Sequence, residues 1–130
     1  MKITLQSLPG ELAYEGTNDR GQTARFSGSK TDVSPMEHLL MAAAACSAID
    51  VEILLQKMRS PATRVEVDVE GTRADAVPAI FTHMKLHYRI YGDVPAKKAE
   101  KVVRMSMEQY CSVSLTLQPQ VKIEHSFEVL

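Results

Sequence analysis

The two cysteines of this chain, Cys46 and Cys111, are the side chains best suited to redox chemistry. A thiolate beside a positive charge is a nucleophile that can attack the O–O bond of a peroxide, which converts it to a sulfenic acid. A second thiol within reach condenses with the sulfenic acid to form a disulfide. Two cysteines therefore suffice for a full oxidation cycle if the fold brings them together.

The simpler alternative is that both thiols are inert. A buried free cysteine usually behaves as a small hydrophobic residue, and burial in apolar surroundings makes a thiol unreactive. The separation of Cys46 and Cys111 in the sequence says nothing about their distance in space. Spacing alone favours the inert interpretation, so the case for chemistry rests on the surroundings of each cysteine.

Cys46 lies within a helix that is predicted to be buried. The segment Ser34-Pro35-Met36-Glu37 supplies an N-cap serine, a proline at the first helical position and a glutamate at the third, which together form a capping box. The helix is expected to run to about Arg59 and to end before Ser60-Pro61. From Leu39 to Ala48 it carries no charge, so other elements must cover it.

A buried thiol needs a nearby cation to ionise, and the helix N-terminus is too far from Cys46 to help. Arg20 and Arg25, in an N-terminal turn and strand, are the candidates, although each is more often a solvated surface residue. Asp50 lies one turn beyond Cys46 on the same face and, if charged, would disfavour the thiolate. Glu37 is about 13 Å from Cys46 along the axis and half a turn out of phase, so it either only caps the helix or serves a cysteine of another subunit.

The remaining elements are those of an α+β domain. The first 28 residues contain turn signals and are expected to form short antiparallel strands. Residues 64–72 and 82–91 alternate apolar and charged side chains, and antiparallel pairing would set acidic against basic ones. A second helix is predicted from Pro95 to about Tyr110, with an apolar stripe that ends at Tyr110 and with Cys111 at its C-terminal end. Residues 121–129 are expected to form a last half-buried strand. We expect one domain, 1–130, with both helices on one face of antiparallel sheet.

The four histidines do not have the spacing of a metal site. His83 and His87 lie in a strand pattern that holds their backbones roughly 13 Å apart. His125, on the apolar face of the last strand, is expected to be a core histidine, and His38 stands beside the helix cap. No glycine-rich phosphate loop or Ser-His-Asp order is present, so we expect neither a metal ion nor a cofactor.

The composition narrows the function class. With 45% hydrophobic and 24% charged residues, the chain has a soluble globular mix. A net charge of −1 with scattered basic residues argues against nucleic acid as a partner. The N-terminus lacks the apolar core of a signal peptide, and no apolar stretch approaches the roughly 20 residues that span a bilayer. We therefore expect a cytoplasmic protein with no membrane partner, in which two cysteines are free, catalytic or redox-sensing.

The two cysteine contexts together resemble a known family. The segment from Ser34 through Cys46 to Val51, followed far downstream by Glu108–Val113 around Cys111, is similar to the OsmC/Ohr family, the osmotically inducible and organic hydroperoxide resistance proteins. The similarity is closer to the OsmC-like branch. It covers the whole chain in element order and length, and its specificity comes from having both cysteines in their two contexts.

The resemblance implies an intertwined homodimer in which two long central helices are buried and two active sites lie at the subunit interface. It implies a thiol-dependent peroxidase with Cys46 as the peroxidatic and Cys111 as the resolving cysteine. It further implies that an arginine, Arg20 or else Arg25, stabilises the thiolate and that Glu37 orients the arginine. In hydroperoxide-resistance members the glutamate directly follows the proline, whereas one residue intervenes here. The implied substrates are organic hydroperoxides, and the implied reductant is a small dithiol or a lipoylated protein, in oxidative or osmotic stress defence.

Two other functions stay open at this point. One is a non-enzymatic, stress-associated dimer that binds an apolar small molecule at the subunit interface. The other is a purely structural domain with inert thiols. A guanidinium within hydrogen-bond reach of the Cys46 sulfur would distinguish the peroxidase from both.

Overall fold

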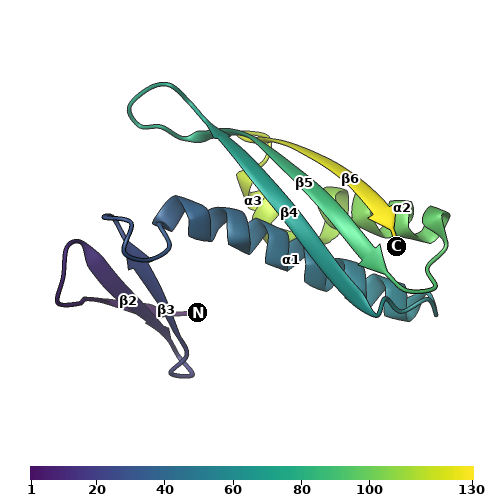
Figure 1. Cartoon of the computed structure of the whole chain (residues 1–130), viewed down its shortest axis with the longest axis horizontal. Coiled ribbons are helices and arrows are strands. Elements are labelled where there is room, and N and C mark those ends of the chain that lie inside the picture. Colours follow the sequence, from purple (N-terminus) through teal and green to yellow (C-terminus); the bar gives the residue numbers. More distant parts are fainter. The chain divides into compact units, whose positions relative to one another are not determined.

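The computed structural model describes all 130 residues, which form two compact units, Met1–Leu39 and Leu40–Leu130. The first unit is a three-stranded antiparallel sheet in the order β1-β2-β3, built from β1 (Ile3–Ser7), β2 (Ala13–Asn18) and β3 (Thr23–Ser27). Figure 1 shows β2 and β3 of this sheet side by side. The side chain of Asn18 accepts hydrogen bonds from the backbone N–H groups of Arg20 and Gln22, which closes the turn between β2 and β3. The prediction of short antiparallel strands is confirmed.

Helix α1 spans Pro35–Lys57, and its start confirms the predicted capping box. The N–H of Glu37 donates to Ser34 Oγ at 3.1 Å, and the N–H of Ser34 donates to Glu37 Oε1 at 3.0 Å. Arg59 adopts a left-handed backbone with φ of 56°, and the N–H of Ser60 reaches back to the carbonyl of Leu55, so the helix ends in a Schellman motif. The predicted end near Arg59 is therefore correct to within two residues.

The sheet of the second unit consists of β4 (Arg64–Arg73), β5 (Phe81–Tyr91) and β6 (Lys122–Val129), in that order. Strands β4 and β5 pair antiparallel, as predicted, and acidic side chains stand opposite basic ones. The Arg89 guanidinium bonds both oxygens of Asp68, which lowers the pKa of that carboxyl. The opposed pairs are Glu66 with Arg89, Asp68 with His87, and Glu70 with Lys85.

The third strand departs from the prediction, because β6 pairs with β5 in parallel. The sheet is therefore mixed, within an α+β fold that is otherwise as expected. The helical segment between β5 and β6 carries the chain back to the start of β5, and a crossover of this kind produces parallel neighbours. His125 also differs from expectation, since it is exposed on β6 and is not a core histidine.

The crossover contains three short helices where one was predicted. Helix α2 spans Ala96–Met105, the π-helix η1 spans Ser106–Tyr110, and α3 spans Ser112–Leu117. The wider turn of η1 changes the helical phase, which is why Tyr110, predicted on the apolar stripe, is 51% exposed. Lys98 of α2 donates to the carbonyl of Met58 and to Ser60 Oγ, so it ties α2 to the end of α1.

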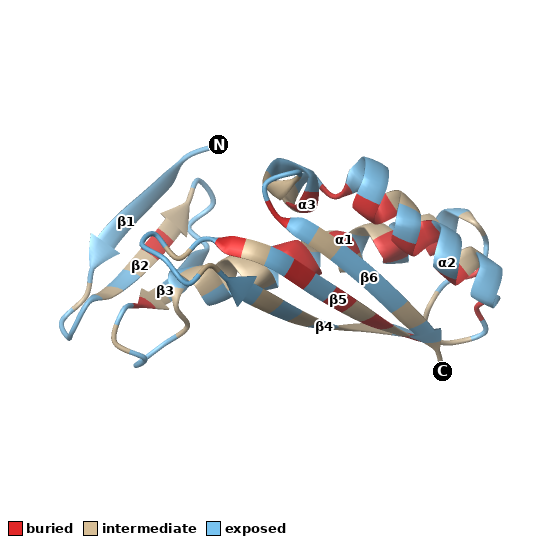
Figure 2. Ribbon diagram, turned by 90° about the horizontal axis from the view of Figure 1, so that it is seen from above, coloured by how far each residue is buried: buried red, intermediate tan, exposed pale blue.

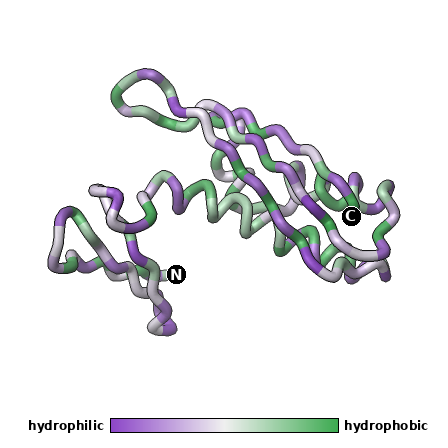
Figure 3. Tube along the Cα trace, viewed as in Figure 1, coloured by the Kyte–Doolittle hydropathy of each residue, from purple (hydrophilic) through white to green (hydrophobic).

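The core of the second unit lies between the sheet and the helices (Figure 2). Every second side chain of β5 faces it, and one side of α1 and of α2 closes it. Figure 3 shows hydrophobic residues following one another along α1, in contrast to the alternation along the strands. The buried side chains of these elements are Phe81, Met84, Leu86, Tyr88 and Ile90 of β5, Val51 and Leu55 of α1, and Ala99, Val102 and Val103 of α2.

The opposite side of α1 is apolar but exposed. Met41 is 52%, Ile49 59% and Ile53 44% exposed. By length and composition alone, α1 is apolar enough to cross a membrane, so the expectation that no segment approaches this length was wrong. The buried face accounts for part of this hydrophobicity, since a core helix passes the same test.

Gly71 of β4 provides a test of the packing between β4 and β5. A Cβ at this position would lie 2.6 Å from Phe81 Cε1 and 2.8 Å from Leu40 Cδ2. We therefore expect Gly71→Ala to lower the free energy of unfolding by about 1–3 kcal/mol, the usual range for overpacking. Urea denaturation curves measure this difference.

Gly16 of β2 is the matched control, because a Cβ there would make only ordinary contacts of 3.5 Å or more. Gly16→Ala should leave the midpoint unchanged or raise it slightly, since alanine loses less backbone entropy on folding. Equal effects of the two substitutions would show that the space above Gly71 is not closed.

Candidate functional site

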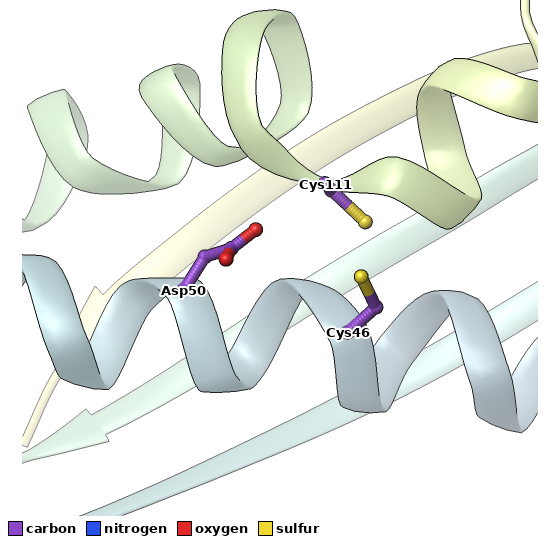
Figure 4. A group of neighbouring side chains, drawn as sticks. All are labelled: Cys46, Asp50 and Cys111. Carbon is purple, nitrogen blue, oxygen red and sulfur yellow. The ribbon is translucent and has the colours of Figure 1, made fainter.

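Three reactive side chains converge between α1 and the segment that follows η1. The Cys46 and Cys111 sulfurs and an Asp50 carboxylate oxygen all lie within 4.8 Å of one another. Figure 4 shows the two sulfur atoms facing each other across the gap, with the Asp50 carboxylate beside them. Both cysteines are free thiols. The fold therefore brings together the two cysteines that the sequence left far apart.

Helix geometry places Cys46 and Asp50 on one face of α1, since residues four apart are neighbours on a helix surface. The π-helix places Cys111. Its wide turn ends with the N–H of Cys111 donating to the carbonyl of Ser106 at 2.8 Å, and Cys111 then leaves the helical conformation with ψ of 101°. π-turns of this kind occur frequently at functional sites.

The two thiols have different surroundings. Cys111 is fully buried, whereas Cys46 is only partly covered. Burial raises the pKa of the Cys111 thiol, and the nearby Cys46 raises it further, against the opposing effect of Ser114. Ser114 stands 3.1 Å from Cys111 Sγ through its hydroxyl, and its backbone N–H donates to the same sulfur at 3.4 Å. Cys46 is therefore the thiol that a substrate can approach, and Cys111 is the thiol held behind it.

A chain of hydroxyl groups connects the sheet to the site. Tyr88 of β5 bonds Ser47 at 2.5 Å, Ser47 bonds Ser106 at 2.8 Å, and Ser106 donates to Asp50 Oδ2 at 3.2 Å. Tyr88, Ser47 and Ser106 are fully buried. Burial raises the pKa of Tyr88 to about 12, so its phenol keeps its hydrogen at neutral pH. The chain fixes the carboxylate beside the two sulfurs.

The donor set of this group consists of two thiols and one carboxylate. The two sulfurs face each other (Figure 4), as in a dithiol that can close to a disulfide. The histidines lie elsewhere, with His83 bonded to Thr82 and His87 bonded to Ser126. We therefore interpret the group as a dithiol with a neighbouring carboxylate.

A hollow lies over β4, β5 and β6 of this unit. Its lining combines charged side chains, among them Asp68, Glu70, Lys85 and Glu124, with histidine, serine and apolar residues. Neither cysteine lines it. The hollow is therefore separate from the thiol site.

The other predicted site residues belong to the first unit. Arg20 lies in the exposed turn after β2 and donates from Nε to Gln22 Oε1 at 3.1 Å. Arg25 of β3 stands 3.5 Å from Glu15 and is 65% exposed. Glu37 forms the capping box, and the N–H of Ser34, followed by the Ser34 hydroxyl, lowers its carboxyl pKa. The roles of these three residues toward Cys46 stay predictions.

Sequence reasoning missed the polar groups that surround the thiols. Ser47 stands inside the apolar run of α1, and Ser106 lies between Val103 and Met107, two residues of the apolar stripe predicted for the second helix. A serine at such a position must find a buried partner, because an unpaired buried hydroxyl is costly. The presence of serines among apolar helix residues therefore indicated buried hydrogen bonds, but the sequence does not reveal which groups form them.

Comparisons with known proteins identify the family of the chain. The model of the family described as OsmC-like protein matches residues 27–126, which include both cysteines. Protein YhfA of Escherichia coli strain K12 is 40% identical over 122 residues, which cover 92% of this chain and 91% of YhfA.

Two solved structures illustrate how far the fold extends. A hypothetical protein from Aquifex aeolicus VF5 is 28% identical with a TM-score of 0.89, covering 99% of this chain and 95% of that one. An organic hydroperoxide resistance protein OsmC from Legionella pneumophila is 17% identical with a TM-score of 0.76, covering 99% and 98%. At that identity the Legionella protein shows a shared fold alone. With the family match over residues 27–126 and the identity to YhfA, the chain belongs to the OsmC-like protein family.

Proposed function

We propose that this protein is a thiol-dependent peroxidase that reduces organic hydroperoxides, with Cys46 as the attacking and Cys111 as the resolving thiol. The observation that carries the proposal is the meeting of a partly accessible thiol and a fully buried one within 4.8 Å. An organic hydroperoxide resistance protein, that of Legionella pneumophila, shares the fold of this chain and supports the proposal.

The first step is attack of the Cys46 thiolate on one oxygen of the hydroperoxide. A sulfur–oxygen bond forms, the O–O bond breaks, and the alkoxide takes up a proton and leaves as an alcohol. The surroundings of Cys46 favour an alkyl hydroperoxide, because the neighbouring face of α1 is apolar. Arg20, or else Arg25, is proposed to stabilise the thiolate, and Glu37 to orient the arginine.

The second step protects Cys46 from further oxidation. Cys111 attacks the sulfenic sulfur, the S–S bond forms and water leaves. A disulfide needs its sulfurs about 2.05 Å apart, so the two side chains must move closer from a separation of at most 4.8 Å to complete the bond. A small dithiol or a lipoylated protein then reduces the disulfide by exchange at the accessible Cys46. Free thiols of this kind fit a reducing, cytoplasmic setting.

We further propose a homodimer, because family members are commonly dimers and one face of α1 is apolar and exposed. Ile49→Glu would place a charge in that face and should shift the sedimentation profile at micromolar concentration from dimer to monomer or aggregate. Val77→Glu is the control, since Val77 is a fully exposed apolar residue outside α1. A wild-type protein that sediments as a stable monomer would contradict the dimer.

Replacement of each cysteine by serine should change peroxide consumption in a different way. Cys46→Ser should abolish consumption of cumene hydroperoxide, since a hydroxyl is a far poorer nucleophile than a thiolate at neutral pH. Cys111→Ser should complete one rapid turnover per subunit and then stop, because the stranded sulfenic acid drifts to sulfinic acid. Stopped-flow kinetics measure the turnover, and mass spectrometry should find two added oxygens on the Cys46 peptide.

Hydrogen peroxide is the control oxidant and should react more slowly than cumene hydroperoxide. If Cys111→Ser keeps full multiple turnover with a dithiol, direct reduction of the sulfenic acid suffices and the resolving role of Cys111 is wrong. If the wild type consumes neither peroxide, the peroxidase proposal is wrong.

The arginine that activates Cys46 can be identified by alkylation. Arg20→Met, or failing that Arg25→Met, should slow the reaction of Cys46 with iodoacetamide at neutral pH, because the thiolate would lose its neighbouring positive charge. Glu37→Gln in the same assay separates an orienting role, which slows labelling, from helix capping alone, which does not. Unchanged labelling in both arginine variants would mean that neither arginine activates the thiol.

A second candidate function is binding of an apolar small molecule without turnover, which the exposed side chains of Met41, Ile49 and Ile53 favour. The oxidation experiment separates the two candidates. A binding protein would lose its free thiols once without regenerating them, whereas a peroxidase would turn over repeatedly with a dithiol.

A further inference from the structure

Asp50 has no role in a cycle of two cysteines, although its carboxylate lies within 4.8 Å of both sulfurs. It is partly buried, and no lysine, arginine or histidine pairs with it. A negative charge at this distance disfavours each thiolate by like-charge repulsion. The carboxylate therefore opposes the first step, and charge pairing does not explain its position.

A series of buried hydroxyl groups holds the Asp50 carboxylate in a defined orientation. An ionised carboxylate only accepts hydrogen bonds, so Ser106 is the donor in its hydrogen bond to Asp50 Oδ2. Ser106 then accepts from Ser47, and Ser47 accepts from Tyr88. Three side chains thus orient one oxygen of Asp50 and leave the other without a hydrogen-bond partner in the second unit.

The attack of Cys111 on the oxidised Cys46 requires a base. Its thiol is fully buried, and its proton must leave when its sulfur attacks Cys46. The carbonyl of Ala43, 4.0 Å away, and the neutral hydroxyl of Ser114 are poor bases, and the Ser114 N–H is a donor. A carboxylate oxygen of Asp50 lies within 4.8 Å of Cys111 Sγ, near enough for proton transfer directly after a small rotation or through one water.

We propose that Asp50 accepts the proton of Cys111 when the disulfide forms and returns it when the disulfide is reduced. This inference rests on the proposed peroxidase function. In the oxidising direction the Cys111 S–H bond breaks, its electron pair forms the bond to Cys46, and the Cys46 S–O bond breaks. The hydroxide that leaves takes a proton from solvent and becomes water.

In the reducing direction the thiolate of the dithiol attacks Cys46. The S–S bond breaks, and its electron pair returns to Cys111, which takes the proton held by Asp50. The second thiol of the dithiol then attacks the mixed disulfide at the dithiol's own sulfur, so that Cys46 leaves as a thiolate and the dithiol becomes the disulfide. Solvent access at Cys46 lets the dithiol reach this sulfur, while Cys111 remains behind it.

The arrangement keeps the charge of the buried group constant. If Cys111 lost its proton to solvent while Asp50 kept its charge, two anions would lie side by side in partly buried surroundings, which is costly. Transfer to Asp50 moves one negative charge from oxygen to sulfur instead, as in carboxylate pairs that share a proton. The titratable groups that face Asp50 are Cys46 on its own helix, Cys111 after η1, and Tyr88 of β5 through Ser47.

The test separates the two steps of oxidation in Asp50→Asn, an uncharged side chain of the same shape. After mixing with one equivalent of cumene hydroperoxide, Cys46 should be oxidised at least as fast as in the wild type, because a repelling charge is gone. Disulfide formation should be about tenfold slower or more. Its rate should also rise only at more alkaline pH, where Cys111 ionises without help. Rapid quenching with a thiol-alkylating reagent and mass spectrometry follow both steps.

Glu52→Gln is the matched control, since Glu52 is an exposed carboxylate on the same helix and should leave both steps unchanged. Disulfide formation at the wild-type rate in Asp50→Asn would overturn the proposal. A slower step with an unchanged pH dependence would also overturn it, because it would indicate only a structural role. If Asp50→Asn does not fold, Asp50→Ser, which still offers Ser106 an acceptor, takes its place under the same criteria.

Diamide makes the outcome independent of the peroxidase proposal. This azo compound adds to one thiolate, and the second thiol then displaces the hydrazine to form the disulfide, so no peroxide is needed. If the wild-type protein does not react with peroxide but forms its disulfide with diamide, the proposed peroxidase function is wrong, while the proposed role of Asp50 can still be tested. With diamide, Asp50→Asn should again close the disulfide more slowly than the wild type, and equal rates would overturn the role of Asp50.

Discussion

The hydrogen bonds of Ser47 are the interaction on which the geometry of the site depends. Ser47 is fully buried in α1, directly beside Cys46, and it bonds Tyr88 of the sheet and Ser106 of η1. Losing either partner would leave a buried hydroxyl unpaired, at a cost of about 1–3 kcal/mol. Apolar contacts can slide by a fraction of a turn at little cost, but these bonds cannot. They fix the rotation of α1, and with it the direction in which Cys46 points.

The same bonds explain why the second helix changes its winding at Ser106. A regular α-helix would carry its phase unchanged past Ser106, whereas η1 widens there and releases the chain at Cys111. The residue that begins the wide turn is also the residue bonded to Ser47 and Asp50. The anchored start and the wider turn together bring the Cys111 sulfur to face α1. A strained or unusual winding at a functional site is a common pattern.

The sequence predicted the elements that follow from local rules. The capping box at Ser34 and the alternation in β4 and β5 are local patterns, and both were correct. The parallel pairing of β6 was missed although the helical crossover implies it, because alternation along a strand is the same in either direction. The π-turn at Ser106 has no periodicity of its own, so the stripe was extended through it to Tyr110.

The candidate site was predictable only in part, for a different reason. Reactive residue types reveal themselves, and so Cys46 and Cys111 stood out at once. The groups that surround the thiols are serines and a tyrosine, and their importance becomes visible only through hydrogen bonds that the folded structure shows. Arg20 and Arg25 show the converse, since their charge suggests a role that local structure neither requires nor explains.

The difference in burial between the two thiols gives the site a direction. A fully buried thiol in an apolar setting is protected from peroxide and from overoxidation, but the same burial hinders its ionisation. A partly accessible thiol has the opposite properties. In the proposed cycle the two thiols have separate roles, because the accessible Cys46 sulfur reacts with peroxide and reductant and the buried Cys111 sulfur reacts only with Cys46. Burial makes loss of the Cys111 proton difficult. The nearby Asp50 carboxylate, held by neutral hydroxyls, can take that proton without adding charge to the core.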